Sequence, residues 1–108
     1  MENLPSEIMG KIILYLSSRD ILSLCIIFPE IISLINYLKI TLNFRNNKIS
    51  DNELRFLSGI YYIDLSDCSN ITDIGLKALT GVHTIDLTCC NKITDDGIKA
   101  LRNTIIIR

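Results

Sequence analysis

Apolar and polar residues in the C-terminal two thirds of the chain follow a pattern that repeats every 22 residues, so that Leu65 recurs as Leu87. Residues 60–79 and 82–101 are near copies of each other, and a degenerate copy spans residues 39–58. A truncated fourth copy follows. Self-similarity at such a period is typical of stacked structural repeats, each of which buries its apolar face against the next.

Each copy begins with apolar residues at alternate positions, which predicts a short strand with these side chains in the core. The strand positions in successive copies are Leu42 and Phe44, then Ile63 and Leu65, then Ile85 and Leu87. A small residue follows where the chain turns and where buried backbone groups need partners. These small residues are Asn47, Cys68 and Cys90.

A short helix is expected after each turn. Thr72-Asp73 and Thr94-Asp95 each offer an N-cap and a negative charge to the first turn of such a helix. The predicted inner faces of the two helices are Leu76 with Leu79, and Ile98 with Leu101.

The first forty residues lack this period and predict three helices instead. Pro5 suits the first helical position, and Ile8, Ile12 and Leu16 then recur at a spacing of four residues. Residues 17–20 supply caps for a second helix, whose apolar side would hold Ile21, Leu24, Cys25 and Phe28. Pro29 opens a third helix with Ile31, Ile32, Leu34, Ile35 and Leu38.

Composition narrows the classes of protein to consider. The 108 residues are 48% hydrophobic with a net charge of −1, which allows a buried core and argues against a phosphate-binding surface for nucleic acids. The apolar stretch 21–38 holds Pro29 and Glu30 at its middle, so short buried helices are expected there rather than a membrane span. Four cysteines without a secretory signal predict reduced thiols and a cytoplasmic or nuclear protein.

The repeats at residues 39–108 resemble the leucine-rich repeat in its cysteine-containing variety. The resemblance implies an α/β solenoid of parallel strands and short helices. Because this family's repeat is usually a few residues longer, we expect tight or partly 3₁₀ helices here. The chain has two clear copies, one degenerate copy and one truncated copy.

Residues 4–22, which begin Leu-Pro-x-Glu-Ile, resemble the opening of an F-box. The resemblance implies a three-helix segment over residues 1–38 that docks onto the S-phase-kinase-associated adaptor subunit of a cullin–RING ubiquitin ligase. Residues 27–31 depart from the family pattern, which usually has a Trp in this region. The residues expected to carry adaptor docking are Leu4, Pro5, Ile8, Ile12, Leu16 and Leu22.

The outward positions of the strands form a candidate surface for a protein client on the concave face. Its members are Thr41, Asn43, Arg45, Tyr62, Asp64, Ser66, Thr84, Asp86 and Thr88. Stacking would place Asp64 beside Asp86, in a row with Asn43 and Arg108. We interpret this row as a solvated acidic stripe, and a carboxylate pair with one raised pKa is the alternative.

These observations predict a non-catalytic, substrate-recruiting adaptor of a cullin–RING ligase, without cofactor or metal. One alternative is a leucine-rich-repeat scaffold or decoy whose helices only cap the solenoid, and another is a small hydrolase that uses the Asp64/Asp86 pair. The thiols of Cys68 and Cys90 are expected inside the repeats and that of Cys89 outside. An apolar last strand at residues 103–108 also predicts self-association.

Overall fold

The computed structural model of the chain describes residues 6–108, with helices first and strands alternating with short helices afterwards. In chain order the elements are α1 (Ser6–Leu14), α2 (Ser18–Ile27), α3 (Ile31–Tyr37), β1 (Thr41–Asn43), α4 (Asp51–Leu54), the 3₁₀ helix η1 (Arg55–Leu57), β2 (Tyr62–Asp64), α5 (Asp73–Leu76), β3 (Thr84–Asp86), α6 (Asp95–Lys99) and β4 (Ile105–Ile107). No helix among these residues is long and apolar enough to cross a lipid bilayer.

The three predicted N-terminal helices are present. The hydroxyl of Ser17 accepts a hydrogen bond from the backbone N–H of Asp20 at 3.2 Å and caps α2, as the sequence predicts. Helix α3 begins at Ile31, two residues after Pro29. Helix α1 ends at Leu14, and Leu16, the last residue of the predicted apolar series, follows in a turn.

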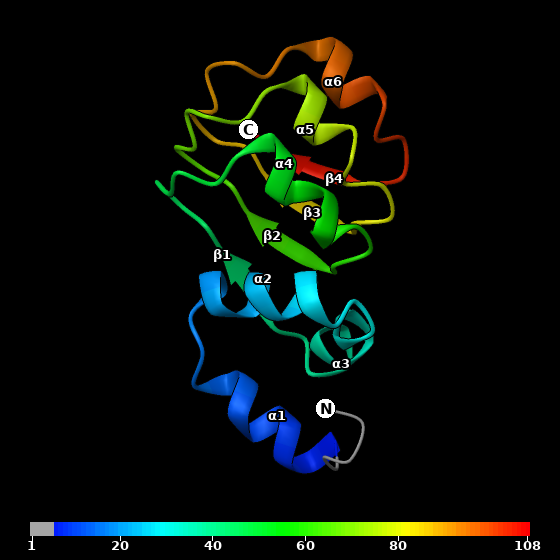
Figure 1. The fold of residues 1–108 in the computed structure, drawn as a ribbon. Helices are drawn as coiled ribbons and strands as arrows, with labels where there is room; N and C mark the ends of the chain where they lie inside the picture. The colour runs from blue at the N-terminus through cyan, green and yellow to red at the C-terminus, as the bar shows by residue number, and fades with distance from the viewer. Residues whose placement is uncertain (1–5) are drawn as a thin grey trace.

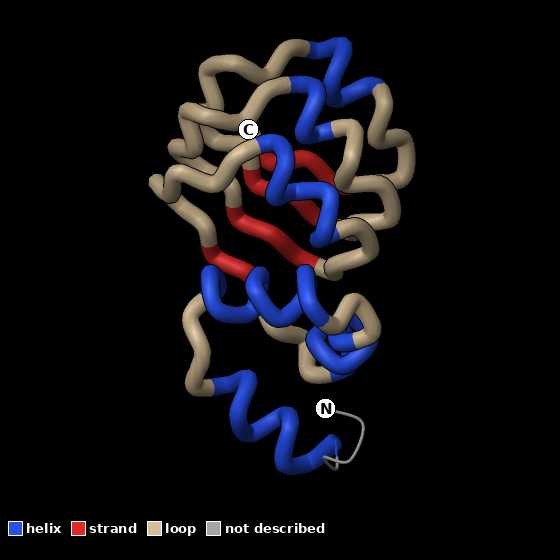
Figure 2. Tube along the Cα trace, in the orientation of Figure 1, coloured by secondary structure: helices blue, strands red, loops and turns tan. Residues whose placement is uncertain are grey.

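The four strands form one parallel sheet in the order β1-β2-β3-β4 (Figures 1 and 2). In register, Leu42 pairs with Ile63, Ile63 with Ile85, and Ile85 with Ile106. Each repeat therefore adds one strand to the sheet and returns through a short helix on the opposite side. The 3₁₀ helix η1 and the helices of four or five residues confirm the predicted tight or partly 3₁₀ helices.

The register of the last strand corrects the predicted alignment. Asp86 pairs with Ile107 rather than with Arg108, because the stretch from the start of α6 to the start of β4 is one residue shorter than the stretch from the start of α5 to the start of β3. Arg108 lies beyond the strand and forms an ion pair with Asp95 at 3.0 Å. The acidic row on the concave face therefore continues into an isoleucine and not into an arginine.

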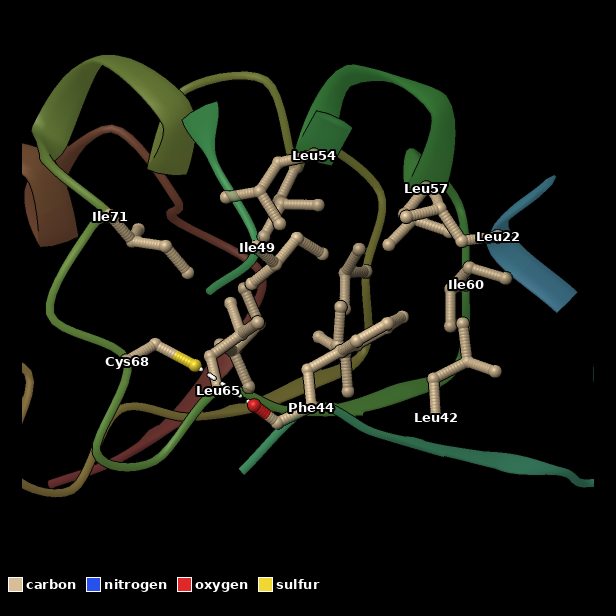
Figure 3. Packing of buried hydrophobic residues seen from close by; sticks show 14 of the residues in the cluster. Leu22, Leu42, Phe44, Ile49, Leu54, Leu57, Ile60, Leu65, Cys68 and Ile71 are labelled. Carbon is tan, nitrogen blue, oxygen red and sulfur yellow. Dashed lines mark hydrogen bonds between the residues drawn. The ribbon is translucent and has the colours of Figure 1, made fainter. Parts of the chain in front are cut away.

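A single apolar core lies between the sheet and the short helices. In Figure 3, Leu42, Phe44, Leu54, Leu57 and Ile60 gather in this layer, and all are at most 1% exposed. The core is fully covered in the middle of the solenoid and less so at the last repeat. The exposed fraction is 0% for Cys68, Ile71, Leu76 and Leu79 but 8% for Cys90, 6% for Ile93 and 5% for Leu101.

Helices α2 and α3 cover the β1 end of the solenoid, whereas α1 lies beyond them (Figure 1). The Asn36 amide of α3 donates to the carbonyl of Gly59 at 2.8 Å and accepts from the backbone N–H of Tyr61 at 2.9 Å. From α2, Arg19 forms an ion pair with Glu53 at 3.0 Å. These contacts join the helical segment to the first repeat.

Candidate protein-interaction surfaces

Polar side chains at the ends of the strands fix one another on the concave face. The Asp64 Oδ1 atom accepts hydrogen bonds from the backbone N–H of Ser66 at 2.9 Å and from its hydroxyl at 2.6 Å. Asp86 makes the same pair of bonds with Thr88, at 3.0 and 2.6 Å. Asn43 accepts from the backbone N–H two residues later at 3.0 Å. The arrangement recurs after β1, β2 and β3 because Asn or Asp side chains readily bond the backbone two residues on.

Two residues of the predicted client surface are buried. Ser66 is 6% and Thr84 7% exposed, so both side chains are buried and correct the prediction that they face a client. The Thr84 hydroxyl bonds the Nδ1 atom of His83 at 2.7 Å. The remaining members are at least partly exposed: Thr41, Asn43, Arg45, Tyr62, Asp64, Asp86 and Thr88.

Asp64 and Asp86 are neighbours in the register of β2 and β3, as the sequence predicts. Each carboxylate accepts a hydrogen bond from the hydroxyl of the serine or threonine two residues later. The only histidine of the chain, His83, stacks on Tyr61 with ring centroids 4.4 Å apart, at the opposite ends of these strands. The arrangement suits a hydrogen-bonding surface, with the free Oδ2 atoms as acceptors.

The Thr-Asp pairs link successive repeats on the helical side. The Asp51 carboxylate accepts from the backbone N–H of Thr72 at 2.9 Å and from its hydroxyl at 2.6 Å. Asp73 receives the equivalent two bonds from Thr94, at 2.8 Å from the N–H. The hydroxyl and the N–H of Thr94 lower the pKa of Asp73. The sequence predicted these residues as helix caps and did not show that they bind across repeats.

The cap prediction is confirmed for one threonine. The Thr72 hydroxyl accepts from the backbone N–H of Ile74 at 3.2 Å. Thr94 precedes α6 in the same extended conformation but makes no side-chain cap bond.

The four cysteines are free, with Cys89 exposed and the other three buried. The thiol of Cys68 donates to the carbonyl of Phe44 at 3.0 Å (Figure 3), and that of Cys90 donates to the carbonyl of Leu65 at 3.0 Å. Each thiol thus satisfies a buried carbonyl of the preceding repeat, which confirms the predicted role of a small polar group at the turn. Burial raises the pKa of Cys68, and raises that of Cys25 and Cys90 to about 11. Within residues 6–108 no three His, Cys, Asp or Glu side chains are grouped so as to hold a metal ion.

The predicted docking residues lie in different surroundings, some exposed and one in the core. Leu4 and Pro5 lie outside the described residues. Ile8 and Ile12 are 47% and 43% exposed on α1, and Leu16 is half-buried against the core. Leu22 is 2% exposed, so it belongs to the core between α2 and the first repeat and the prediction of a surface role for it is wrong.

Sequence reasoning missed one exposed residue beside Ile8 and Ile12. Tyr15, the first residue after α1, is 91% exposed and follows Ile12 by three residues, and this helical spacing is the signal that could have identified it. On another side of α1, an open groove of about 830 Å³ runs between α1 and α3. It is lined by Gly10, Lys11, Leu14, Glu30, Ser33, Leu34, Tyr37 and Leu38.

Two segments of the chain, residues 62–79 and 82–101, match the family model described as Leucine Rich repeat. They coincide with the two clear copies of the repeat. Together with the parallel sheet, in which each repeat contributes one strand, the matches support a leucine-rich repeat protein. No F-box model matches the N-terminal helices, and no curated protein matches the chain.

Proposed function

We propose that the protein is a non-catalytic binding module that holds a protein client on its repeats and docks through α1 onto the adaptor subunit of a cullin–RING ligase. Its leucine-rich repeats are the basis for assigning it to protein–protein interaction. The observation that carries the docking proposal is the apolar stripe of Ile8 and Ile12 on α1 and Tyr15 directly after it, which remains exposed although α2 and α3 already cover the solenoid end.

The other side of α1 is occupied by packing within the chain. Ile13 is 1% exposed, and Gly10 lies close enough to Leu38 of the α3 end that an added Cβ would be 3.2 Å from its Cδ1 atom. The exposed stripe is therefore an additional apolar surface, which a helix serving only as a cap does not need. Contiguous exposed apolar side chains mark interaction sites in soluble proteins.

The concave face supports the client-binding part of the proposal. Its central strands present carboxylates held in fixed orientation, and Arg45 at its edge pairs with Asp67 at 3.4 Å. A preorganised set of hydrogen-bond acceptors binds a polar partner with a small entropic cost. We therefore expect a client segment rich in hydrogen-bond donors.

A non-catalytic role is supported by the use of these carboxylates. Asp64 and Asp86 both accept bonds from their own hydroxyl partners, and those hydroxyls have no adjacent histidine to act as a base. The hydrolase alternative would need such a nucleophile and base in contact.

The second candidate function is a scaffold or decoy whose helices are only a cap. The contacts of Asn36 and Arg19 with the first repeat favour a capping role for α2 and α3. The two candidates differ in what they require of α1.

Calorimetric titration of the full chain with the purified adaptor subunit separates them. We expect binding by the unmodified chain and its loss in Ile8→Glu, because the new carboxylate would be desolvated without a partner at the interface. Ile74→Glu is the matched control, since Ile74 is 77% exposed on α5 in the repeats, and it should bind normally. Absence of binding by the unmodified chain would instead favour the scaffold.

A further inference from the structure

An open pocket of about 390 Å³ lies between the loops that precede β3 and β4. Its walls are residues 80–83 and 100–104, so it is separate from α1 and from the carboxylates of the concave face. Val82 and Leu101 line the pocket and are themselves buried, so these apolar side chains form its floor. Polar residues line most of the remainder.

The loop before β4 is unusually short, and this leaves a backbone donor unused in the pocket. Residues 102–104 take the place of residues 80–83 in the preceding repeat, which is one residue fewer. One repeat earlier, the Gly59 N–H donates to the carbonyl of Thr80 at 3.1 Å and joins the two equivalent loops. The N–H of Gly81 has no such backbone acceptor among residues 6–108, and Gly81 is exposed in the pocket wall.

The charge of the pocket is positive. Arg102 lines it, and no aspartate or glutamate of residues 6–108 does so. The three ion pairs among the described residues use Arg19, Arg45 and Arg108, which leaves the guanidinium of Arg102 available. A guanidinium presents its N–H donors as a planar fork that fits the oxygens of a carboxylate or a phosphate.

Further hydrogen-bonding groups surround the guanidinium. Asn103 follows Arg102 in the same wall and is exposed. The Nδ1 atom of His83 is bonded to the Thr84 hydroxyl at 2.7 Å, so Nε2 is the ring nitrogen left for a ligand. The hydroxyl of Thr80 belongs to the opposite wall. A carboxylate has two oxygens for these groups, whereas a phosphate ester has three strong acceptor oxygens and a larger negative charge.

We propose that this pocket binds a phosphate group. Arg102 is its ionic partner, and the amide of Asn103, the N–H of Gly81 and the imidazole of His83 are its hydrogen-bonding partners. The apolar floor contacts the carbon atoms to which the phosphate is esterified. Such a combination of an apolar lining with a few placed polar groups is typical of small-ligand sites.

Nuclear magnetic resonance titration of the isotope-labelled full chain with inorganic phosphate tests the proposal, at an ionic strength held constant with sodium chloride. We expect saturable shifts of the backbone amides of Gly81 and residues 102–104. Arg102→Gln should weaken binding about tenfold, because it removes the ionic partner. Arg55→Gln is the matched control, since Arg55 is exposed on η1 and does not line the pocket, and it should bind as the unmodified chain does.

O-phosphoserine and a phosphoserine peptide distinguish two sources of the phosphate group. Tighter binding of the peptide assigns the pocket to a phosphorylated peptide, and equal affinity assigns it to a free phosphate ester. Circular dichroism verifies that each variant is folded. Absence of saturable shifts at Gly81 and residues 102–104, or equal affinities of Arg102→Gln and Arg55→Gln for inorganic phosphate, would overturn the proposal.

Discussion

In the short helices α5 and α6, an aspartate of the preceding repeat leaves no room for a side chain at the glycine position. A Cβ added at Gly97 would lie 2.3 Å from Oδ1 and 2.7 Å from Cγ of Asp73, and one added at Gly75 would lie 2.2 Å from Oδ1 of Asp51. The same aspartates accept the hydrogen bonds of Thr72 and Thr94. The aspartate of one repeat thus contacts both the threonine and the glycine of the next repeat.

Gly97→Ala should destabilise the protein by about 1–3 kcal/mol, because the clash with Asp73 outweighs the better helix propensity of alanine. Urea denaturation measures the loss. Combining it with Asp73→Ala should cost less than the sum of the two single changes, since most of the clash is then absent. Gly10→Ala is the control, as its Cβ would meet only the flexible end of Leu38, and additive losses for the Gly97/Asp73 pair would contradict this explanation.

Cys89 occupies a backbone conformation that suits other residues better. Its φ is 61°, and the equivalent positions of the two preceding repeats, Asn46 and Asp67, have φ of 55° and 58°. Asparagine and aspartate tolerate this left-handed region better than cysteine does. Cys89→Asn should therefore raise the free energy of unfolding by up to about 1 kcal/mol, whereas Cys89→Ala, which also removes the thiol, should bring no gain. Equal stabilities of the two variants would refute the conformational explanation.

The buried thiols should make stability fall at high pH. Burial raises the pKa of Cys25 and Cys90 from 9.0 to about 11, so the unfolded chain loses these protons first as the pH increases. The contribution of these two thiols to the free energy of unfolding is therefore complete below pH 9 and is lost between about pH 9 and 11. Urea midpoints across this range should fall less steeply in Cys25→Ala than in the unmodified chain. An unchanged slope in Cys25→Ala would contradict the prediction.

At the scale of single residues, the sequence predicted which side chains are inside a repeat but not what they contact. Cys68 and Cys90 were identified as interior thiols, yet their carbonyl partners come from the preceding repeat and depend on how the repeats stack. Arg108 was misaligned because one residue is missing before β4, and the short apolar run 105–107 fits either register. A one-residue slip reverses which side chains face the core.

At the scale of elements, one amide of α3 makes two hydrogen bonds to the repeats, beside the apolar contacts of Ile31 and Ile35 in the core. Asn36→Ala leaves the carbonyl of Gly59 and the N–H of Tyr61 without their protein partner, and should cost about 2 kcal/mol or more. Thermal or urea unfolding measures this. Ser23→Ala removes one exposed bond within α2 and should change stability by less than about 0.5 kcal/mol. Similar losses in both variants would mean that the two hydrogen bonds of Asn36 are unimportant for stability.

The sequence predicted where the helices and strands lie along the chain, but not which neighbours they pack against. Helical spacing located α1, α2 and α3, and the repeat period located the strands, because both periods are encoded locally. The same spacing could not say which neighbour covers each apolar side. Leu22 was consequently placed on the docking surface, although it packs in the core, and Tyr15 was overlooked. The F-box identity of the helical segment stays a prediction for the same reason.

At the scale of the whole molecule, the candidate surfaces follow the long axis of a body of 43 × 25 × 20 Å. Helix α1 with its exposed apolar residues lies at one end, and the sheet of the repeats lies in the rest of the molecule (Figure 1). This separation allows docking and client binding without overlap. Each can therefore be removed by substitution without disturbing the other.

Hydrogen–deuterium exchange of the full chain, with and without the purified adaptor subunit, tests the central claim most directly. The account predicts that the adaptor slows exchange in peptides covering α1 and leaves the concave strands β2 and β3 unchanged. Ile8→Glu should abolish that protection while the exchange of α2, α3 and the repeats stays as in the unmodified chain. Absence of any protection by the adaptor, or protection confined to the repeats, would contradict the assignment of α1 as its docking element.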